Sequence, residues 1–419
     1  MKKIAIIGAG ISGLTAARML EATCDVTIYE KDARPGGLIK CERIDGSLFH
    51  TCGGHVFNTK KQDVAQWFWK QFNQDSDFVK ADRNSVVRFE REIVPYPIEN
   101  HVYMLDRETQ CRFIEDCLSI SKGGTAEPTD FEAFLRGRFG DTLYNLYFKP
   151  YNEKVWRCNL KHVSLAWLEG KLPMPTVQEM LFNNFNHIAE KQFVHSSFYY
   201  EKNNGSQFMA DTLASGLNIH YNADIDSLTY AGGKWHVAGQ EYDWIVYCGN
   251  IKEMITRIHG VNVDAFAAEV DALAYHGTTA VFCEIDANPY SWIYLPSDRY
   301  ACHRIICTGN FALSNNAPML PDGRITATVE FTDAITKVDI LDNLAKMPYN
   351  PAYITHRYNQ YTYPIQTAST RQMIQNLKQE LSSRAFYFTG RFADWEYYNM
   401  DVAMAAAMNV CADINSKCV

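Results

Sequence analysis

The amino-acid sequence predicts an α/β protein with three parts: a parallel-sheet domain, a helical insertion and an antiparallel β-sheet domain. Three observations predict this fold class. The first thirty residues have the pattern of a strand, a glycine-rich turn, a helix and a second strand. Apolar residues after Pro97 recur at three-to-four spacing, which is typical of helices. The region 278–329 is rich in aromatic and β-branched residues, which favour strands.

Length and composition limit the classes of protein. A chain of 419 residues is longer than one hydrophobic core ordinarily supports, so we expect more than one substructure. The composition, with 47% hydrophobic and 21% charged residues, excludes a disordered or coiled-coil protein. The net charge of −8 argues against nucleic acid as a partner. The twelve cysteines include no CxxC pair, so we expect reduced thiols in a cytoplasmic protein and no metal site. No apolar stretch approaches the ~20 residues of a spanning helix, so no membrane insertion is expected.

Hydrophobic periodicity predicts the elements in chain order. In the first half, the predicted strands are residues 3–8, 25–30, 86–90 and 93–96, and the predicted helices are 11–20, 64–72, 105–120, 131–139 and 143–156. In the second half, the predicted strands are 192–200, 218–221, 225–230, 235–238, 244–248 and 385–389, with further strands within 278–329, and the predicted helices are 209–216, 369–381 and a last one from Met400. We expect the antiparallel sheet to contain 192–200 and 278–329.

A dinucleotide-binding motif lies at the first strand–helix junction. The run Gly8-Ala9-Gly10-Ile11-Ser12-Gly13 is a GxGxxG, and Glu30 ends the next predicted strand. Gly8 permits a tight turn, Gly10 lets the backbone approach a pyrophosphate, and Gly13 allows close helix packing. The helix N-terminus offers N–H groups to phosphates, and Glu30 can accept hydrogen bonds from ribose. The motif predicts a Rossmann-type domain.

A second glycine pair favours FAD over NAD as the dinucleotide. Lys31-Asp32-Ala33-Arg34-Pro35-Gly36-Gly37-Leu38 continues directly from Glu30. With this acid and glycine pair, the sequence resembles the superfamily of FAD-dependent amine oxidases and UDP-galactopyranose mutases. The resemblance implies that Ser12, Lys31, Leu38 and Ile225 also contact the cofactor.

Two further motifs resemble the mutases. Gly53-Gly54-His55 resembles their Gly-His element, which implies that Gly54 and His55 lie against the flavin ring. Gly390-Arg391-Phe392-Ala393-Asp394-Trp395-Glu396-Tyr397-Tyr398-Asn399-Met400-Asp401 resembles their C-terminal signature. By that resemblance Gly390 and Arg391 contact the FAD pyrophosphate, Met400 lies under the ring, and Tyr397 reaches the substrate phosphates. Asn399 stands where bacterial mutases have Asp.

The substrate residues are also implied by resemblance. Tyr294 and Arg304 resemble the family's substrate tyrosine and diphosphate-binding arginine. Arginine suits this role because its planar guanidinium makes bidentate hydrogen bonds to phosphate. Tyr363 lies in a similar tyrosine–proline element. Lys171 occupies the position of a second phosphate-binding arginine of the family. A lysine keeps the positive charge there but cannot make the bidentate hydrogen bonds of a guanidinium. The uridine-stacking aromatic is not identified, with Phe182, Phe185, Phe193 and Phe198 in the matching region.

The resemblance implies a Rossmann-type FAD-binding domain of residues 1–80, 201–270 and 380–419, a helical domain of 98–185, and an antiparallel β-sheet substrate domain of 81–97, 186–200 and 271–379. It implies an isomerase of polysaccharide biosynthesis in which N5 of reduced FAD attacks the anomeric carbon of a nucleotide sugar, converting pyranose to furanose. NAD(P)H is considered as an external reductant, and a homodimer is considered because bacterial members commonly dimerise. The alternatives are an FAD-dependent oxidoreductase, of the amine oxidase or protoporphyrinogen oxidase kind, and a flavin-binding protein without catalysis.

Overall fold

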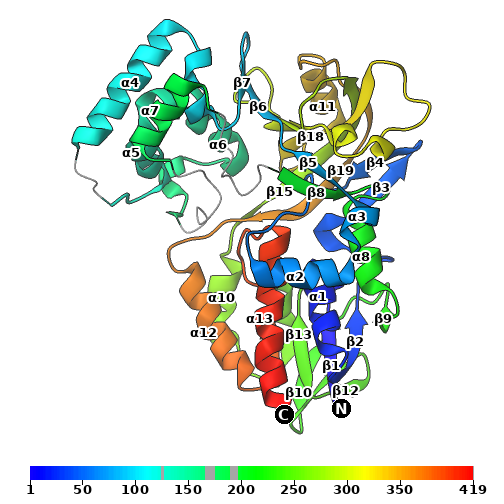
Figure 1. Ribbon diagram of the computed structural model, residues 1–419. Coiled ribbons are helices and arrows are strands. Elements are labelled where there is room, and N and C mark those ends of the chain that lie inside the picture. Colours follow the sequence, from blue (N-terminus) through cyan, green and yellow to red (C-terminus); the bar gives the residue numbers. More distant parts are fainter. Residues whose placement is uncertain (124–126, 166–174, 189–196, 419) are drawn as a thin grey trace.

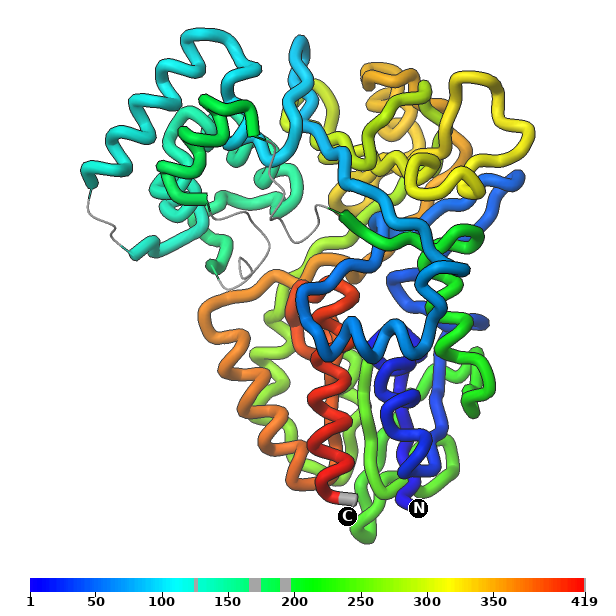
Figure 2. Tube along the Cα trace, viewed as in Figure 1, coloured from blue at the N-terminus to red at the C-terminus, as the bar shows by residue number. Residues whose placement is uncertain are grey.

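The computed structural model describes residues 1–123, 127–165, 175–188 and 197–418. Figure 1 shows a lower lobe around β1, β2 and β13, an upper lobe of strands that includes β15, β18 and β19, and a helical lobe of α4 to α7 beside it. In the chain trace of Figure 2, blue, green and red segments lie together in the lower lobe, where both termini are found. The predicted α/β class with helical and antiparallel parts is confirmed. The domain boundaries stay a prediction.

The helices of the described residues are α1 (Ile11–Leu20), α2 (Gln62–Gln71), α3 (Gln74–Asp77), α4 (Arg107–Lys122), α5 (Phe131–Leu143), α6 (Lys149–Trp156), α7 (Val177–Asn186), α8 (Ser206–Ala214), α9 (Ile251–Arg257), α10 (Asp264–Asp271), α11 (Lys337–Leu344), α12 (Thr370–Ser382) and α13 (Met400–Cys418). The strands are β1 (Lys2–Ile7), β2 (Cys24–Tyr29), β3 (Cys41–Ile44), β4 (Ser47–His50), β5 (Phe78–Asp82), β6 (Ser85–Arg88), β7 (Ile93–Pro95), β8 (Ser197–Glu201), β9 (Ile219–His220), β10 (Leu228–Ala231), β11 (Lys234–Val237), β12 (Gln240–Tyr242), β13 (Trp244–Tyr247), β14 (Ile258–His259), β15 (Tyr275–Asp286), β16 (Trp292–Tyr294), β17 (Arg304–Ile306), β18 (Arg324–Thr332), β19 (Ala352–Pro364) and β20 (Phe386–Phe388).

The lower lobe contains a parallel sheet that is covered on both faces. Its strand order is β20-β13-β1-β2-β9. Successive side chains of a strand point to opposite faces, so Ile4 and Ile6 of β1 join one buried cluster and Ala5 and Ile7 the other. Helices α1 and α13 pack together on the first face. The carboxyl ends of these strands therefore meet at one edge, where ligands of open parallel sheets bind.

A small antiparallel-rich sheet and helix α12 complete the lower lobe. The predicted hairpin of 225–238 forms as antiparallel β10 and β11, inside a four-stranded sheet of order β12-β11-β10-β14. Trp235 of β11 is fully buried and packs with Leu377 of α12 in the second cluster. This layer covers the face of the parallel sheet opposite α1.

The upper lobe is built on a seven-stranded sheet of order β19-β15-β18-β17-β16-β6-β7. All its neighbouring strands are antiparallel except β16 and β6. The two long strands β15 and β18 pair directly from Thr279↔Phe331 to Asp286↔Arg324. On its other side β18 pairs with β17, and that register fixes which side chains of β17 and β18 lie opposite each other in the site described below.

Two sequence-based predictions need correction, one for a strand and one for a helix. Within 192–200, the described strand β8 pairs with β5 in a separate two-stranded sheet rather than with the seven-stranded one. The predicted helix 143–156 begins as a π-helical turn at Tyr144–Phe148, and only α6 is α-helical. The kink just before it, at Gly140 with φ of +83°, is a backbone conformation that glycine adopts without strain.

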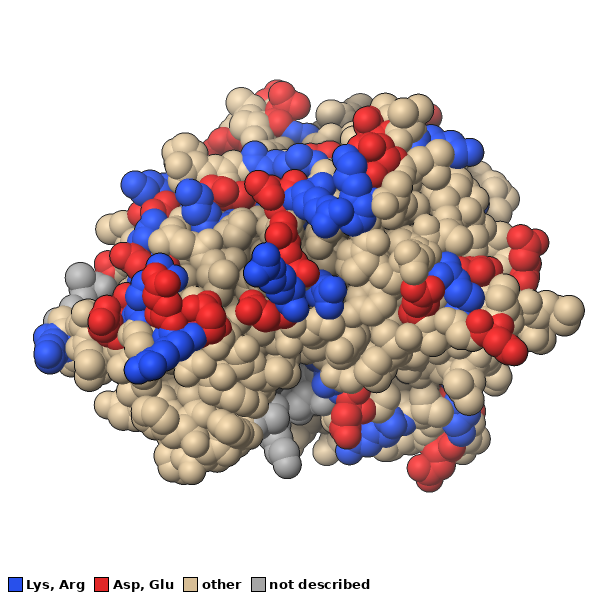
Figure 3. Space-filling model, turned by 90° about the horizontal axis from the view of Figure 1, so that it is seen from above, with Lys and Arg blue, Asp and Glu red and all other residues tan. Residues whose placement is uncertain are grey.

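The helical lobe has its own buried core. Phe113 of α4, Leu135 of α5 and Trp156 of α6 share one cluster with Tyr294 and Tyr363 of the large sheet. The helical lobe therefore packs on the edge of the sheet lobe and closes one side of the site. Within the part of the chain that the structure describes, no helix is long and apolar enough to span a bilayer. Figure 3 shows acidic and basic side chains interspersed over the face seen from above.

Candidate active site

Two cavities meet between the lobes. The first, of about 610 Å³, lies at the carboxyl edge of the parallel sheet, and we call it the glycine cavity because Gly8, Gly10, Gly36, Gly37 and Gly390 line it. The second, of about 300 Å³, lies between the large sheet and the helical lobe. We call it the arginine cavity, because its described lining includes three arginines, Arg83, Arg304 and Arg391. The two cavities share the lining residues His55, Arg391, Asn399 and Met400.

The glycine cavity begins where β1 turns into α1. A Cβ on Gly13 would lie 1.9 Å from the carbonyl oxygen of Gly8, so only glycine permits the helix to approach the turn this closely. Gly8 itself has φ of +105°. No side chain caps α1 at Gly10, so the first N–H groups of the helix are available to a ligand. An uncapped helix N-terminus beside a glycine turn suits phosphate groups.

Glu30 lies at the end of the neighbouring strand. Its side chain is buried, and its carboxylate accepts the N–H of Ala9 at 2.7 Å and the N–H of Asp32 at 2.9 Å. These bonds fix the carboxylate beside the turn, where its remaining lone pairs can accept ribose hydroxyls.

The second glycine pair packs directly on the first turn. A Cβ on Gly37 would lie 3.3 Å from the Cα of Gly10, which leaves room only for backbone. Gly36 donates its N–H to the carbonyl of Ala9 at 2.9 Å. Gly390 follows β20, and a Cβ there would approach the hydroxyl of Ser12 in α1 to 3.2 Å. At these turns the wall is therefore bare backbone that can approach a dinucleotide closely.

His55 stands where the two cavities join. Its Nε2 is buried and has no hydrogen-bond partner among the described residues. Burial, with repulsion from the Arg391 and Arg304 guanidinium groups, lowers the pKa of His55 to about 4. The imidazole is therefore neutral at pH 7, and its unpartnered nitrogen fits a ligand group in the junction.

Arg391 lies in the same junction. Its Nε donates to the carbonyl of Tyr398 at 3.0 Å and its Nη1 to the carbonyl of Thr362 at 3.3 Å. Its guanidinium carbon lies 4.8 Å from the ring centre of Tyr397. These bonds to carbonyl groups orient the side chain and leave its charge without a carboxylate partner among the described residues.

Arg304 is held by a buried carboxylate. Arg304 of β17 lies directly opposite Glu330 of β18, and its Nε donates to the Glu330 carboxylate. Burial opposes ionisation of Glu330, but attraction to Arg304, with His303 Nε2 3.6 Å away, outweighs it and lowers the pKa to about 2. The other carboxylate oxygen accepts the N–H of Gly53 at 2.8 Å. One carboxylate therefore fixes both the arginine and the glycine turn that carries His55.

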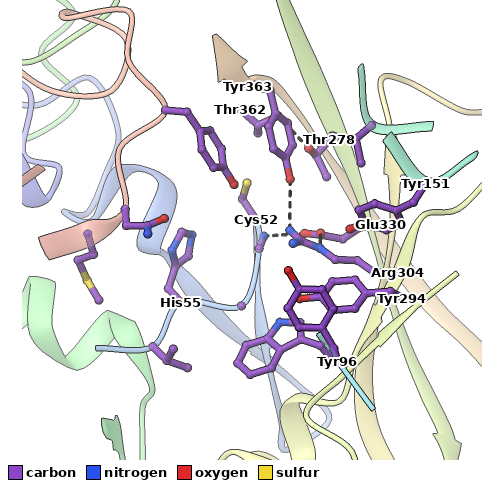
Figure 4. Close-up of a pocket in the computed structure, with 18 of the residues that line it drawn as sticks. Cys52, His55, Tyr96, Tyr151, Thr278, Tyr294, Arg304, Glu330, Thr362 and Tyr363 are labelled. Carbon is purple, nitrogen blue, oxygen red and sulfur yellow. Dashed lines mark hydrogen bonds and ion pairs between the residues drawn. The ribbon is translucent and has the colours of Figure 1, made fainter. Parts of the chain in front are cut away.

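Tyrosines complete the wall around Arg304. Arg304 donates from Nη2 to the hydroxyl of Tyr363 at 3.3 Å, and Figure 4 shows Tyr363 and Glu330 both pointing toward Arg304. Tyr363 stacks on Tyr397 with ring centres 5.1 Å apart. Tyr294 lies directly opposite Arg304 across β16 and β17, and Tyr151 packs on its edge. Burial raises the pKa of Tyr151 and of Tyr363, so both phenols stay protonated and can donate.

The comparisons with known proteins agree with this geometry. Residues 6–72 match the family model of an NAD(P)-binding Rossmann-like domain, which identifies the nucleotide fold. The dTDP-fucopyranose mutase of Escherichia coli is 23% identical over 100% of this chain and 99% of its own length. A probable UDP-galactopyranose mutase of Klebsiella pneumoniae is 22% identical over 99% of this chain and 95% of its own. The crystal structure of reduced UDP-galactopyranose mutase superposes with a TM-score of 0.87 at 20% identity, covering 99% of this chain and 96% of that one. The chain resembles these mutases from end to end.

The predicted resemblance to the mutases is therefore confirmed, and the chain has their fold. An oxidase also matches over a shorter span. The coproporphyrinogen III oxidase of Staphylococcus aureus is 52% identical over 307 residues, which cover 64% of this chain and 63% of the oxidase. Isomerases and oxidases thus share this framework, so the reaction must be argued from the site.

The structure brings nearly all predicted site residues to the two cavities. The predicted cofactor residues that line the glycine cavity are Gly8, Gly10, Ser12, Glu30, Lys31, Gly36, Gly37, Leu38, His55, Ile225, Gly390, Arg391, Asn399 and Met400. Gly13 packs behind the turn instead, and Gly54 lines the arginine cavity. The predicted catalytic residues that line the arginine cavity are His55, Tyr294, Arg304, Tyr363, Tyr397 and Asn399. Lys171 lies outside the described residues. The roles of all these residues stay predictions.

The sequence did not point to several residues of the arginine cavity. Arg83, Tyr96 and Glu330 line it without belonging to a recognised motif. Only strand pairing brings them to the site, as with Glu330 opposite Arg304. Of the four aromatic residues considered for stacking, Phe198 lines the arginine cavity, Phe182 and Phe185 are exposed, and Phe193 lies outside the described residues.

Proposed function

We propose that the protein is a flavin-dependent isomerase that interconverts the pyranose and furanose forms of a nucleotide sugar, as UDP-galactopyranose mutases do. The observation that carries the proposal is the junction of the two cavities. A cavity suited to a dinucleotide opens at His55, Arg391, Asn399 and Met400 into one lined by arginines and tyrosines. A nucleotide sugar offers this second cavity an anionic diphosphate and many hydroxyl groups.

We propose FAD as the dinucleotide. The close pair of glycine turns and the wall at Gly390 suit a molecule held along its length, and the unpartnered Nε2 of His55 suits the ring of a flavin that extends into the junction. Gly8, Gly10, Glu30 and Gly390 would hold the cofactor. When bound and reduced, the flavin supplies a nucleophilic ring nitrogen for the anomeric carbon, with NAD(P)H or another donor as external reductant.

The chain's own groups bind and orient the substrate. Arg304 attracts the substrate diphosphate and stabilises its charge when the bond to the anomeric carbon breaks, whereas Arg391 would neutralise the FAD pyrophosphate. The Tyr294, Tyr363 and Tyr397 hydroxyls line the same wall, where they can donate to phosphate or sugar oxygens. Because the imidazole of His55 is neutral at pH 7, it adds no positive charge beside the flavin ring. The Glu330 carboxylate accepts hydrogen bonds from both Arg304 and Gly53. It therefore fixes the position of the substrate-binding arginine relative to the turn that carries His55.

The test is isomerisation by the reduced protein. The purified protein is reduced with dithionite under anaerobic conditions, UDP-galactofuranose is added, and chromatography follows UDP-galactopyranose. We expect a product peak that depends on reduction. A bound, reducible flavin with no product from UDP-galactofuranose, UDP-galactose or a dTDP-deoxysugar would contradict the proposal.

An oxidoreductase is the second candidate, favoured by the partial match to coproporphyrinogen III oxidase. The two reactions differ in electron flow. An oxidase consumes oxygen or another acceptor in proportion to its product, whereas an isomerase transfers no net electrons. Oxygen uptake that is stoichiometric with turnover would favour the oxidase.

A further inference from the structure

Arg83 is a cation of the arginine cavity that no predicted role includes. It lies in the short link between β5 and β6, and its half-buried side chain lines the cavity. Three contacts orient it: Nε donates to the hydroxyl of Ser85 at 2.7 Å, Nη2 donates to the hydroxyl of Tyr294, and the guanidinium carbon lies 4.7 Å from a ring centre of Trp292. The side chain is therefore held in one position rather than free in solvent.

Among the residues that the structure describes, none neutralises the charge of Arg83. Arg304 is paired with Glu330, but no carboxylate of the described residues lies within ion-pair distance of Arg83. Asp401 also lines the cavity, and its carboxylate is hydrogen-bonded to Thr59. A guanidinium has five N–H donors, and the bonds to Ser85 and Tyr294 use two of them. The remaining donors and the uncompensated charge suit an anionic group that enters the cavity.

Arg83 is linked to Arg304 through one tyrosine. The Tyr294 hydroxyl accepts from Arg83, and Tyr294 lies directly opposite Arg304 across β16 and β17. The two guanidinium groups therefore flank the same tyrosine on the same cavity wall. Two fixed cations on one wall can bind separate oxygens of one polyanion, or a diphosphate and a second acidic group.

We propose that Arg83 binds an anionic oxygen of the substrate and so sets its specificity. This inference rests on the proposed function, since it takes the ligand to be a nucleotide sugar. The oxygen belongs either to the diphosphate, beside Arg304, or to a carboxylate on the sugar ring. In both cases the charge of Arg83 is compensated only when the ligand is bound, so the residue discriminates in favour of anionic ligands.

The experiment measures dissociation constants of the flavin-loaded full-length protein by isothermal titration calorimetry. The ligands are uridine, UDP, UDP-galactose and UDP-galacturonate. The variants are Arg83→Gln, Arg83→Lys and a matched control, Arg91→Gln, which removes an exposed arginine beyond β6. Because a charge-assisted hydrogen bond is worth more than a neutral one, Arg83→Gln is expected to weaken binding of the relevant anion about tenfold or more. Arg83→Lys should recover part of the loss, and uridine binding and Arg91→Gln should match the wild type.

The ligands separate the two sources of the anion. An equal loss for UDP, UDP-galactose and UDP-galacturonate assigns Arg83 to the diphosphate, and a loss confined to UDP-galacturonate assigns it to a sugar carboxylate. Unchanged affinity of Arg83→Gln for all three, or an equal loss for uridine, overturns the inference while leaving the proposed function intact. If the wild type binds none of the three nucleotides with its flavin in place, the proposed function fails and the inference with it. If Arg83→Gln does not fold, Arg83→Met takes its place because it also removes the charge, and an affinity equal to that of the wild type for all three nucleotides would overturn the inference.

Discussion

The glycine cavity and the arginine cavity adjoin each other but are built in different ways. In the first, the turns at Gly8, Gly37 and Gly390 present bare backbone, and the close approach at these turns depends on the absence of side chains there. The second is made largely of charged and aromatic side chains that reach inward from the β5–β6 link, from β16, β17, β18 and β19, and from the helical lobe. A backbone site tolerates no added atom, whereas a side-chain site can lose one group and keep its shape. Four predictions test this difference, from the largest expected effect to the smallest.

The largest effect is expected from Gly13→Val. Its Cβ would lie 1.9 Å from the Gly8 carbonyl oxygen, which real Cβ atoms do not approach, so α1 must move from the turn. We expect insoluble protein or protein without bound flavin, measured as flavin absorbance per mole of protein. Gly137→Ala is the control, because no atom lies within 4 Å of its added Cβ. A fully loaded, normally stable Gly13→Val protein would show that the turn is not a close backbone contact.

Arg304→Ala should lower turnover by orders of magnitude while bound flavin is kept. The change removes a cation from the arginine cavity and leaves Glu330 buried without its main partner, which costs about 3–5 kcal/mol of unfolding free energy. The double variant Arg304→Ala/Glu330→Gln should regain much of this stability but none of the turnover. Urea unfolding and steady-state kinetics measure the two effects. Near-normal turnover in either variant would remove Arg304 from the reaction.

The stability of the protein should fall in acid because of His50, whose ring centre lies 6.2 Å from that of His55. Burial, with repulsion from His55, lowers the pKa of His50 to about 3, against about 6.5 in the unfolded chain. Because the unfolded state binds the proton more tightly, His50 subtracts stability as the pH falls from about 6.5 toward 3. Between pH 7 and pH 5 the loss is about 2 kcal/mol.

The pH dependence of unfolding by urea measures the contribution of His50. His50→Gln should remove about 2 kcal/mol of the stability loss between pH 7 and pH 5 and leave the part that comes from His55, whose pKa is also lowered. The exposed His162 provides the control, since His162→Gln should keep the wild-type slope. An unchanged slope in His50→Gln would contradict the assignment of the proton uptake to His50.

The smallest effect is expected from Tyr363→Phe. It removes one hydroxyl, which accepts from Arg304 at 3.3 Å, while the phenyl ring can still stack on Tyr397. A single hydrogen bond is worth about 1 kcal/mol, so kcat/KM should fall about fivefold with flavin content unchanged. Tyr353→Phe, on the same strand but outside both cavities, should leave kcat/KM unchanged. A loss as large as that of Arg304→Ala would mean that the phenol acts in the reaction itself.

The two cavities also differ in how far the sequence predicts them. The GxGxxG, Glu30 and the second glycine pair are local patterns, and their spacing alone places them around one turn. Gly390 to Met400 adds a recognisable motif at the far end of the chain. The predicted helix 11–20 agrees with α1 residue for residue, because the motif, the apolar spacing and the helix length all indicate the same segment.

The residues that the sequence did not reveal are those whose partners lie far away along the chain. Glu330 is 26 residues from Arg304, and only the register of β17 against β18 pairs them. Arg83 is 211 residues from Tyr294 and reaches it because β6 pairs with β16. The strand predicted at 192–200 was assigned to the wrong sheet for the same reason, since a strand's sequence does not specify its neighbour.

By itself, the sequence determined the nucleotide fold, its glycine turns and the resemblance to the mutases, because these depend on backbone conformations and spacings that are local in the chain. The tertiary structure alone decided which charges meet. It placed Glu330 between Arg304 and Gly53, and it left Arg83 with no carboxylate of the described residues within ion-pair distance. The physical reason is that the interaction of two charged groups depends on distance and burial, and both are set by the pairing of strands that lie far apart in the sequence.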